Sequence, residues 1–228
     1  MDLQRLSIWL IMSLLARPAM ASDISLLALG DSYTIGEAVS THQRWPVQLG
    51  NMLVNHGINL AEPVIIARTG WTTANLATAI KSRSITPHFD IVTLLTGVND
   101  QFQGHSVKDY RMAFRALVKT AIKYAADRPD HVIVLSIPDY SVTPFAQRFN
   151  PERIASELAE FNNINKILSL EEGVHYIDIT AMSQQAAQQR DLLASDGLHP
   201  SGLMYRHWAE KILPVVLQIV KTPDRNQP

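Results

Sequence analysis

Five short apolar runs alternate with longer amphipathic segments along most of the chain. The runs lie at 24–29, 63–67, 90–95, 131–137 and 174–179. Apolar residues at helical spacing predict helices at 45–56, 73–82, 107–126, 151–170, 182–192 and 201–220. Strands that alternate with helices favour right-handed crossovers around a parallel sheet. The runs are apolar throughout, as expected of strands that helices cover on both faces. Pro214 predicts a kink or break in the last helix.

The first 21 residues depart from this pattern and predict a secretory signal peptide. Arg5 adds positive charge, residues 6–16 are almost wholly apolar, and Ala19 and Ala21 are small residues at a cleavage site. We expect cleavage after Ala21, export to the periplasm or beyond the cell, and one domain over 22–228. The alternatives are an uncleaved anchor or a buried N-terminal helix. The apolar stretch is shorter than the ~20 residues of a spanning helix, so we expect no stable membrane span after processing.

The composition excludes several classes of protein. Hydrophobic residues make up 46% of the chain and charged residues 18%, which is typical of a globular domain and not of a disordered one. The formal net charge of −1 gives no basic excess for phosphate contacts, so we expect no nucleic-acid partner. Without cysteine there is no disulfide, no thiolate metal site and no cysteine nucleophile. The histidines other than His199 lack paired ligand spacing, so we expect no bound metal. We also expect no cofactor, and we expect the protein to be a monomer.

Polar residues and a glycine follow the first three strands, at the edge where parallel sheets bind ligands. Ser32 follows the first strand and opens a helix, which would hold its Oγ beside free backbone N–H groups. Gly70 and Asn99 follow the second and third strands and, with the N–H of Ser32, could donate to an oxyanion. The alternative is that Ser32 is only a helix N-cap and that Gly70 and Asn99 are only turn residues.

Asp196 and His199 are three residues apart in a turn before the last helix. At this spacing the carboxylate can accept a hydrogen bond from His199 Nδ1–H and leave Nε2 free as a base. The alternative is a surface turn in which Asp196 caps a helix. Taken together, a nucleophile, a base with its orienting carboxylate and two further donors fall at one edge of one sheet.

At this point the sequence resembles the SGNH, or GDSL, hydrolase family. The matching blocks are Gly30-Asp31-Ser32-Tyr33, Gly70, Gly97-Val98-Asn99-Asp100 and Asp196-Gly197-Leu198-His199-Pro200, which correspond to the family's first, second, third and fifth blocks. They occur in the expected order across almost the whole mature chain. The resemblance implies a flavodoxin-like three-layer α/β/α sandwich with a five-stranded parallel sheet.

The resemblance also implies a reaction and a set of site residues. The reaction is hydrolysis of carboxylic or thio esters through an acyl-serine intermediate. Ser32 would be the nucleophile, His199 the general base and acid, and Asp196 the group that orients the imidazole. The backbone N–H groups of Ser32 and Gly70 and the side chain of Asn99 would form the oxyanion hole.

Three other residues of the matching blocks bear on the site without belonging to this set. Tyr33 occupies the position at which the family's common motif has leucine. We expect Asp31 to brace the turn that holds Ser32. We expect Asp100 to cap or brace the loop that positions Asn99.

The resemblance points to the lysophospholipase-like or thioesterase-like bacterial branch, with a small-molecule or lipid ester as substrate. Alternatives are a carbohydrate O-acetyl esterase, a non-catalytic SGNH module that binds lipid or glycan, and a flavodoxin-like protein that binds a nucleotide or another small ligand. The last needs a glycine-rich phosphate loop, which residues 30–36 supply poorly. An ordinary α/β-hydrolase fits worse, because Thr34 breaks the G-x-S-x-G pattern.

Two stretches after strand ends are expected to shape the substrate pocket. They are 101–106, with Phe102, and 139–150, with Tyr140, Phe145 and Phe149. The aromatic residues of the second stretch would form an apolar wall for an acyl chain, or else pack beneath their own loop.

Overall fold

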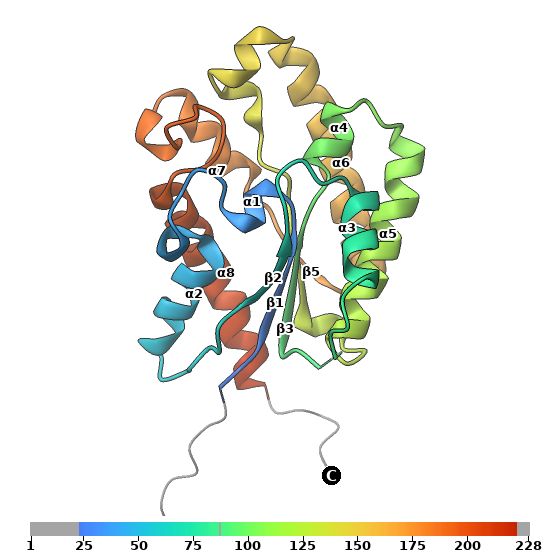
Figure 1. Ribbon diagram of the computed structural model, residues 1–228, viewed down its shortest axis with the longest axis vertical. Helices are drawn as coiled ribbons and strands as arrows, with labels where there is room; N and C mark the ends of the chain where they lie inside the picture. Colours follow the sequence, from blue (N-terminus) through green and yellow to red (C-terminus); the bar gives the residue numbers. More distant parts are fainter. Residues whose placement is uncertain (1–22, 87, 223–228) are drawn as a thin grey trace, which may run out of the picture.

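A parallel sheet of five strands forms the middle layer of the computed structural model, which describes residues 23–86 and 88–222 (Figure 1). The strands are β1 (Leu26–Gly30), β2 (Val64–Ala67), β3 (Ile91–Leu95), β4 (Val132–Leu135) and β5 (His175–Ile177). Their order is β2-β1-β3-β4-β5, and every pair is parallel. The expected flavodoxin-like α/β fold is therefore confirmed. The predicted signal peptide lies outside the described residues and stays a prediction.

Helices cover both faces of the sheet. The longer ones are α2 (Trp45–Val54), α3 (Thr73–Lys81), α5 (Val107–Tyr124), α6 (Pro151–Glu171) and α8 (Gly202–Lys221). Figure 1 shows α2 and α8 on one face and α3, α5 and α6 on the other. Strands β1 and β3 are buried along their whole length, which is why their sequences are continuous apolar runs. Trp45 and Trp208 are fully buried in the layer formed by α2 and α8.

The strand order places a crevice between β1 and β3. From β1 the chain passes through α2 to β2, and it returns to β3 through α3 on the other face of the sheet. In doubly wound sheets, ligands bind outside the carboxyl ends of the strands at such a reversal. Two short helices begin there, α1 (Ser32–Ile35) after β1 and α4 (Val98–Phe102) after β3.

Gly30 ends β1 at a place with no room for a side chain. A Cβ atom there would lie 2.1 Å from Thr34 Oγ1 and 2.5 Å from the carbonyl oxygen of Leu95. The absence of a side chain lets α1 begin directly at the strand end and close to β3. The glycine therefore sets how near Ser32 lies to the residues that follow β3.

Two of the helix predictions need correction. The single helix predicted at 182–192 is wrong: α7 (Thr180–Gln184) is followed by two 3-10 helices, Gln185–Ala187 and Arg190–Leu192. Residues 187–191 are exposed, so no apolar stripe holds a longer helix against the core. Of the kink or break expected at Pro214, the break does not occur: α8 continues through Pro214, which lies with Glu210 on the exposed face of the helix, where the missing N–H is tolerated more easily than in the core.

Within residues 23–86 and 88–222, no helix combines the length and the apolar character that a membrane crossing requires.

Candidate active site

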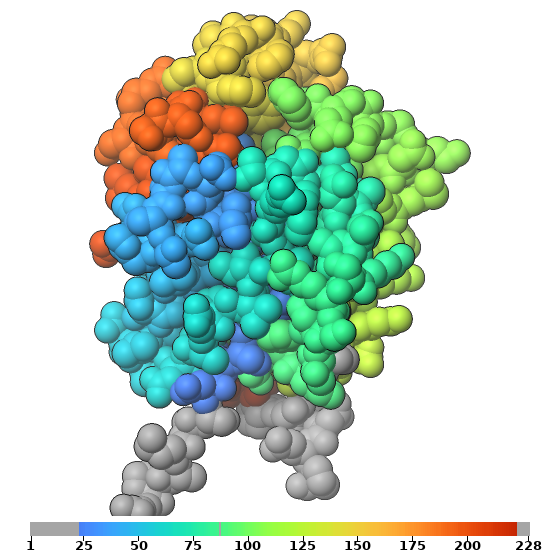
Figure 2. Space-filling view, viewed as in Figure 1, coloured from blue at the N-terminus to red at the C-terminus, as the bar shows by residue number. Residues whose placement is uncertain are grey.

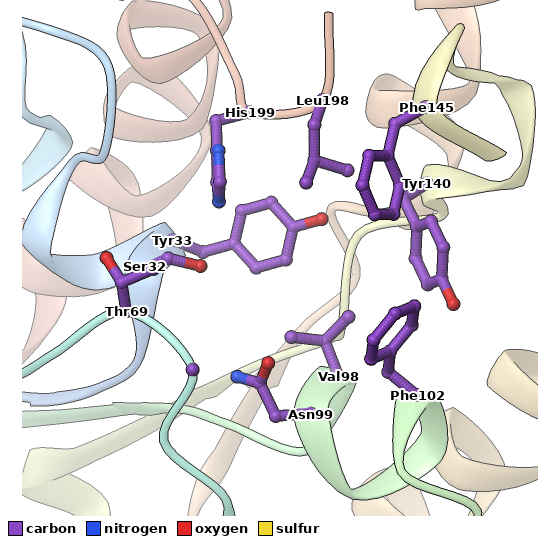
Figure 3. A pocket seen from close by; sticks show the side chains of 11 residues that line it. Ser32, Tyr33, Thr69, Val98, Asn99, Phe102, Tyr140, Phe145, Leu198 and His199 are labelled. Carbon is purple, nitrogen blue, oxygen red and sulfur yellow. The ribbon is translucent and has the colours of Figure 1, made fainter. Parts of the chain in front are cut away.

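A pocket at the carboxyl ends of β1, β2 and β3 collects most of the candidate residues. Its volume is about 160 Å³, and its lining consists of Ser32, Tyr33, Thr69, Gly70, Val98, Asn99, Phe102, Tyr140, Phe145, Leu198 and His199. Figure 3 shows the polar side chains of this set at one end and Phe102, Tyr140 and Phe145 at the other. The sequence-predicted Ser32, Gly70, Asn99 and His199 thus come together in one cavity. Asp196 lies behind His199, to which it is hydrogen-bonded.

Ser32 is held at the first position of the one-turn helix α1. Asp31 caps this helix, because its Oδ1 accepts a hydrogen bond from the backbone N–H of Tyr33 at 3.0 Å. Gly36, in a left-handed conformation with φ of 72°, ends the helix and donates to the carbonyl of Ser32. As the first residue of a helix, Ser32 has a backbone N–H without an intrahelical acceptor, so this group is available to a ligand.

His199 and Asp196 form a close pair. His199 Nδ1 lies 2.6 Å from Asp196 Oδ2, while Asp196 Oδ1 accepts the backbone N–H groups of Leu198 and His199, each at 3.0 Å. Partial burial by itself would raise the pKa of Asp196, but the three hydrogen bonds and the nearby imidazole lower it below its ordinary value. The carboxylate therefore stays charged near neutral pH, which fixes the proton of His199 on Nδ1 and leaves Nε2 free.

His199 and Ser32 line the same pocket without a direct bond. Among the hydrogen bonds of the described residues, none joins the Ser32 hydroxyl to His199. In sites without a bound ligand, hydrogen bonds of this kind are often long and tighten only when the substrate binds.

Two neutral donors come from the segments after β2 and β3. Gly70 has a φ of 82°, a left-handed conformation that favours glycine, and lies in an exposed loop. Asn99 Nδ2 donates to the carbonyl of Trp71 at 2.9 Å, so one of its two amide protons fixes the loop that carries Gly70. Its other proton is available to a ligand.

Asp100 strengthens this connection. Its carboxylate accepts the backbone N–H of Thr73 at 2.9 Å and the Thr73 hydroxyl at 2.6 Å. Because Thr73 begins α3, Asp100 joins α4 to the end of the loop after β2. Asp100 therefore braces the loop that contains Gly70, whereas the sequence-based expectation was that it would brace the loop that positions Asn99.

Asp31 is a buried carboxyl group next to Ser32. Its Oδ2 has no hydrogen-bond partner, and only 1% of the residue is exposed. Burial raises the pKa of Asp31 to about 8, with a further rise from the charge of Asp100 and an opposing effect of the Tyr33 N–H. Asp31 is therefore neutral in the folded chain at pH 7.

This raised pKa makes the stability of the fold depend on pH. An unfolded aspartate loses its proton near pH 4, whereas folded Asp31 keeps it up to about pH 8. Between these values the folded state binds more protons, so the free energy of unfolding falls as pH rises, by up to about 1.4 kcal/mol per unit. Asp31→Asn keeps the cap acceptor and removes the titration. We expect its stability relative to the wild type to increase from pH 5 to pH 8 in urea unfolding, and parallel pH curves would contradict this assignment.

The aromatic end of the pocket comes from the two stretches expected to shape it. Phe102, in α4, packs against Phe145 with ring centroids 6.1 Å apart, and against Tyr140 at 6.4 Å. Phe149 packs edge-on against Phe102 at 5.6 Å, and both residues are 48% exposed. Figure 2 shows the stretch that contains Tyr140 (yellow) at the upper end of the molecule, beside the green segment that contains α4. Phe102, Tyr140 and Phe145 line the pocket, and half-exposed Phe149 packs on Phe102 beside it. The alternative that the aromatic residues of 139–150 pack beneath their own loop is therefore wrong for Phe149.

Four pocket residues were not singled out from the sequence as substrate contacts. They are Tyr33, Thr69, Val98 and Leu198. Three of them directly precede or follow a predicted site residue in the sequence: Tyr33 follows Ser32, Val98 precedes Asn99 and Leu198 precedes His199. This adjacency could have identified them as pocket residues. In the described part of the chain, no group of three acidic or histidine side chains is placed to hold a metal ion.

Comparison with known proteins agrees with this arrangement. Residues 28–207 match the model of the GDSL-like lipase/acylhydrolase family. A search of curated proteins gave no match.

Solved structures with the same fold include three enzymes of low sequence identity. TesA is 18% identical, with a TM-score of 0.68 over 86% of this chain and 99% of its own. The psychrotrophic esterase EstA from Pseudoalteromonas sp. is 18% identical, with a TM-score of 0.63 over 88% and 100%. The acetylxylan esterase Axe2 from Geobacillus stearothermophilus is 17% identical, with a TM-score of 0.66 over 86% and 95%. At these identities the structures establish the fold, whereas the family model covers most of the chain: the protein is a hydrolase that belongs to the GDSL-like lipase/acylhydrolase family.

Proposed function

We propose that the chain hydrolyses carboxylic or thio esters of apolar acyl groups through an acyl intermediate on Ser32. One observation carries the proposal: a serine, a histidine paired with a carboxylate, and two neutral donors surround one end of a pocket whose other end is aromatic. Acyl transfer needs a nucleophile, a base and an oxyanion site at the reacting carbon, and an apolar surface suits the acyl chain.

Each residue has a role in this mechanism. Ser32 Oγ attacks the acyl carbon while His199 Nε2 accepts its proton, and Asp196 stabilises the imidazolium. The oxyanion of the tetrahedral intermediate accepts hydrogen bonds from the N–H groups of Ser32 and Gly70 and from Asn99 Nδ2. Collapse expels the alcohol or thiol, which takes the proton from His199. Water then attacks the acyl-serine by the same steps and releases the acid.

Replacement of Asn99 tests the oxyanion site. Asn99→Ala removes a donor that acts on the developing charge, so we expect kcat to fall by about 10²–10³-fold with a smaller change in KM. Because Asn99 also holds the carbonyl of Trp71, Asn99→Asp is the companion variant: it keeps the size of the side chain and lacks the donor. Gln103→Ala, an exposed change at the end of the same helix, is the control. A kcat within fivefold of wild type for both Asn99 variants would exclude this role.

The lining of the pocket supports the lysophospholipase-like or thioesterase-like substrate class. Val98 and Leu198 lie between its polar end and the aromatic rings of Phe102, Tyr140 and Phe145. An acyl chain that leaves the reacting carbon toward these residues would exchange water for apolar contacts, which is favourable by about 0.8 kcal/mol per buried methylene.

A carbohydrate O-acetyl esterase is the second candidate. Its support is the small volume of the pocket, about 160 Å³, which suits an acetyl group. Phe102 and Phe149 are half-exposed beside the pocket and offer flat apolar faces to a larger leaving group.

Hydrolysis assays separate the two candidates. We expect kcat/KM for p-nitrophenyl butyrate to exceed that for the acetate, and a lysophospholipid or acyl thioester to be cleaved faster than acetylated xylan. Phe145→Ala should lower kcat/KM for butyrate more than for acetate, because it removes part of the apolar wall. A strong preference for acetylated xylan would favour the second candidate, and hydrolysis of none of these esters would overturn the proposed function.

A further inference from the structure

Tyr33 stands inside the pocket in a position that the reaction does not use. It follows Ser32 in α1, is 3% exposed, and its ring meets the edge of His199 at 5.7 Å and lies 6.3 Å from Trp208 of α8. Figure 3 shows the ring extending from the polar end of the pocket, with its hydroxyl directed away from Ser32 toward the aromatic end. These contacts fix the ring in one place.

A second, smaller cavity lies on the other side of this ring. Tyr33, Tyr140 and Leu198 line both cavities, so they form the wall between them. The far side of the second cavity includes Leu192 and Met204. Its volume is about 10 Å³, close to the minimum that holds one water molecule and too small for an acyl chain while the wall stays in place.

The Tyr33 hydroxyl makes no hydrogen bond in the described part of the chain, although its side chain is almost fully buried. Burial, together with the charge of Asp31, raises the pKa of Tyr33 well above its ordinary value, so the hydroxyl stays neutral. A hydroxyl without a protein partner does not anchor the ring. The ring is therefore held in place by its packing against His199 and Trp208.

We propose that Tyr33 is a specificity-determining residue: it closes the acyl pocket on the side of the second cavity and so limits how many methylenes of the acyl chain are buried. This inference rests on the proposed function. The family takes its name from a motif with leucine at this position, and a leucine has about four fewer non-hydrogen atoms than a tyrosine. A smaller side chain there would join the two cavities, since large-to-small changes in a packed site leave space where the neighbours do not collapse.

The test is the dependence of kcat/KM on chain length for p-nitrophenyl acetate, butyrate, hexanoate and octanoate. For the wild type we expect kcat/KM to level off beyond butyrate, because further methylenes gain no buried contact. For Tyr33→Leu we expect the rise to continue, by about fourfold for each methylene that enters the second cavity, and the ratio of octanoate to butyrate to increase at least about tenfold. Ratios within one variant cancel any general loss of activity from weaker packing on His199.

Two companion variants make the result decisive. Tyr33→Phe keeps the ring and removes the hydroxyl, so its chain-length ratios should match those of the wild type. Leu198→Ala shortens another residue of the wall between the two cavities, so it should also raise the ratio of octanoate to butyrate. If circular dichroism shows Tyr33→Leu to be unfolded, Leu198→Ala takes its place in the test. Unchanged ratios in a folded Tyr33→Leu or Leu198→Ala protein would overturn the proposal while leaving ester hydrolysis intact. If the wild type hydrolyses none of these esters, the proposed function is overturned as well.

Discussion

Replacing Ser32 with alanine is expected to lower kcat for every ester by about 10⁴-fold or more, because it removes the hydroxyl that forms the acyl intermediate beside His199. The methyl group fits where the hydroxyl was, since Ser32 makes no side-chain hydrogen bond that the fold depends on. A small residual rate would come from the oxyanion donors and from substrate binding alone. Steady-state assays at saturating ester, with circular dichroism to verify folding, measure the effect.

Labelling with a phosphonate ester gives an independent measurement of the same nucleophile. The reagent should add its mass to the peptide that contains Ser32 in the wild type and not in Ser32→Ala. Ser84→Ala, a change at an exposed serine after α3, is the matched control and should leave both hydrolysis and labelling unchanged. A Ser32→Ala enzyme that retains a tenth of the wild-type rate would falsify the assignment.

Asp196→Asn is expected to lower kcat by about 10³–10⁴-fold with little effect on folding. The amide oxygen of asparagine can still accept the backbone N–H groups of Leu198 and His199, so the turn is retained. The other side-chain atom becomes an N–H donor facing His199 Nδ1, 2.6 Å away in the wild type. The imidazole must then carry its proton on Nε2, and it can no longer act as a base toward Ser32.

Two further variants show whether Asp196 acts through the reaction. Asp191→Asn removes an exposed carboxylate from the same segment and should have no effect on kcat. Adding Asp196→Asn to Ser32→Ala should cause little further loss, because residues that act as one unit are not additive. If the two losses multiply, Asp196 has a role separate from the nucleophile.

The sheet could be predicted from the sequence because burial on both faces leaves a simple pattern. β1 and β3 have no exposed face, so their apolar runs are uninterrupted and end at the residues that form the site. The parallel arrangement then brings Ser32 and Asn99, which are far apart in the chain, to one edge. Local pattern and topology together were sufficient to group most of the pocket.

Other features depend on contacts that a single sequence does not display. The one-turn helix α4 has too few residues for a periodic signal and is held by Asp100 through its bonds to Thr73. The segment at 182–192 has helical composition, yet its exposed part has no partner to pack on. The position of Tyr33 between two cavities follows from its packing on Trp208, a residue of the last helix.

The shortness of α1 and α4 affects how selectivity can be altered by mutation. Each of these helices carries a residue of the reaction together with a residue that shapes the acyl pocket: α1 carries Ser32 and Tyr33, and α4 carries Asn99 and Phe102. A substitution at Tyr33 or Phe102 therefore falls on the same helical turn as a reacting group. Phe145, by contrast, comes from a separate 3-10 helix, Phe145–Arg148, that bears none of them. Laboratory evolution for new acyl groups should accumulate tolerated changes in that segment first, and changes in α1 or α4 only with compensating substitutions.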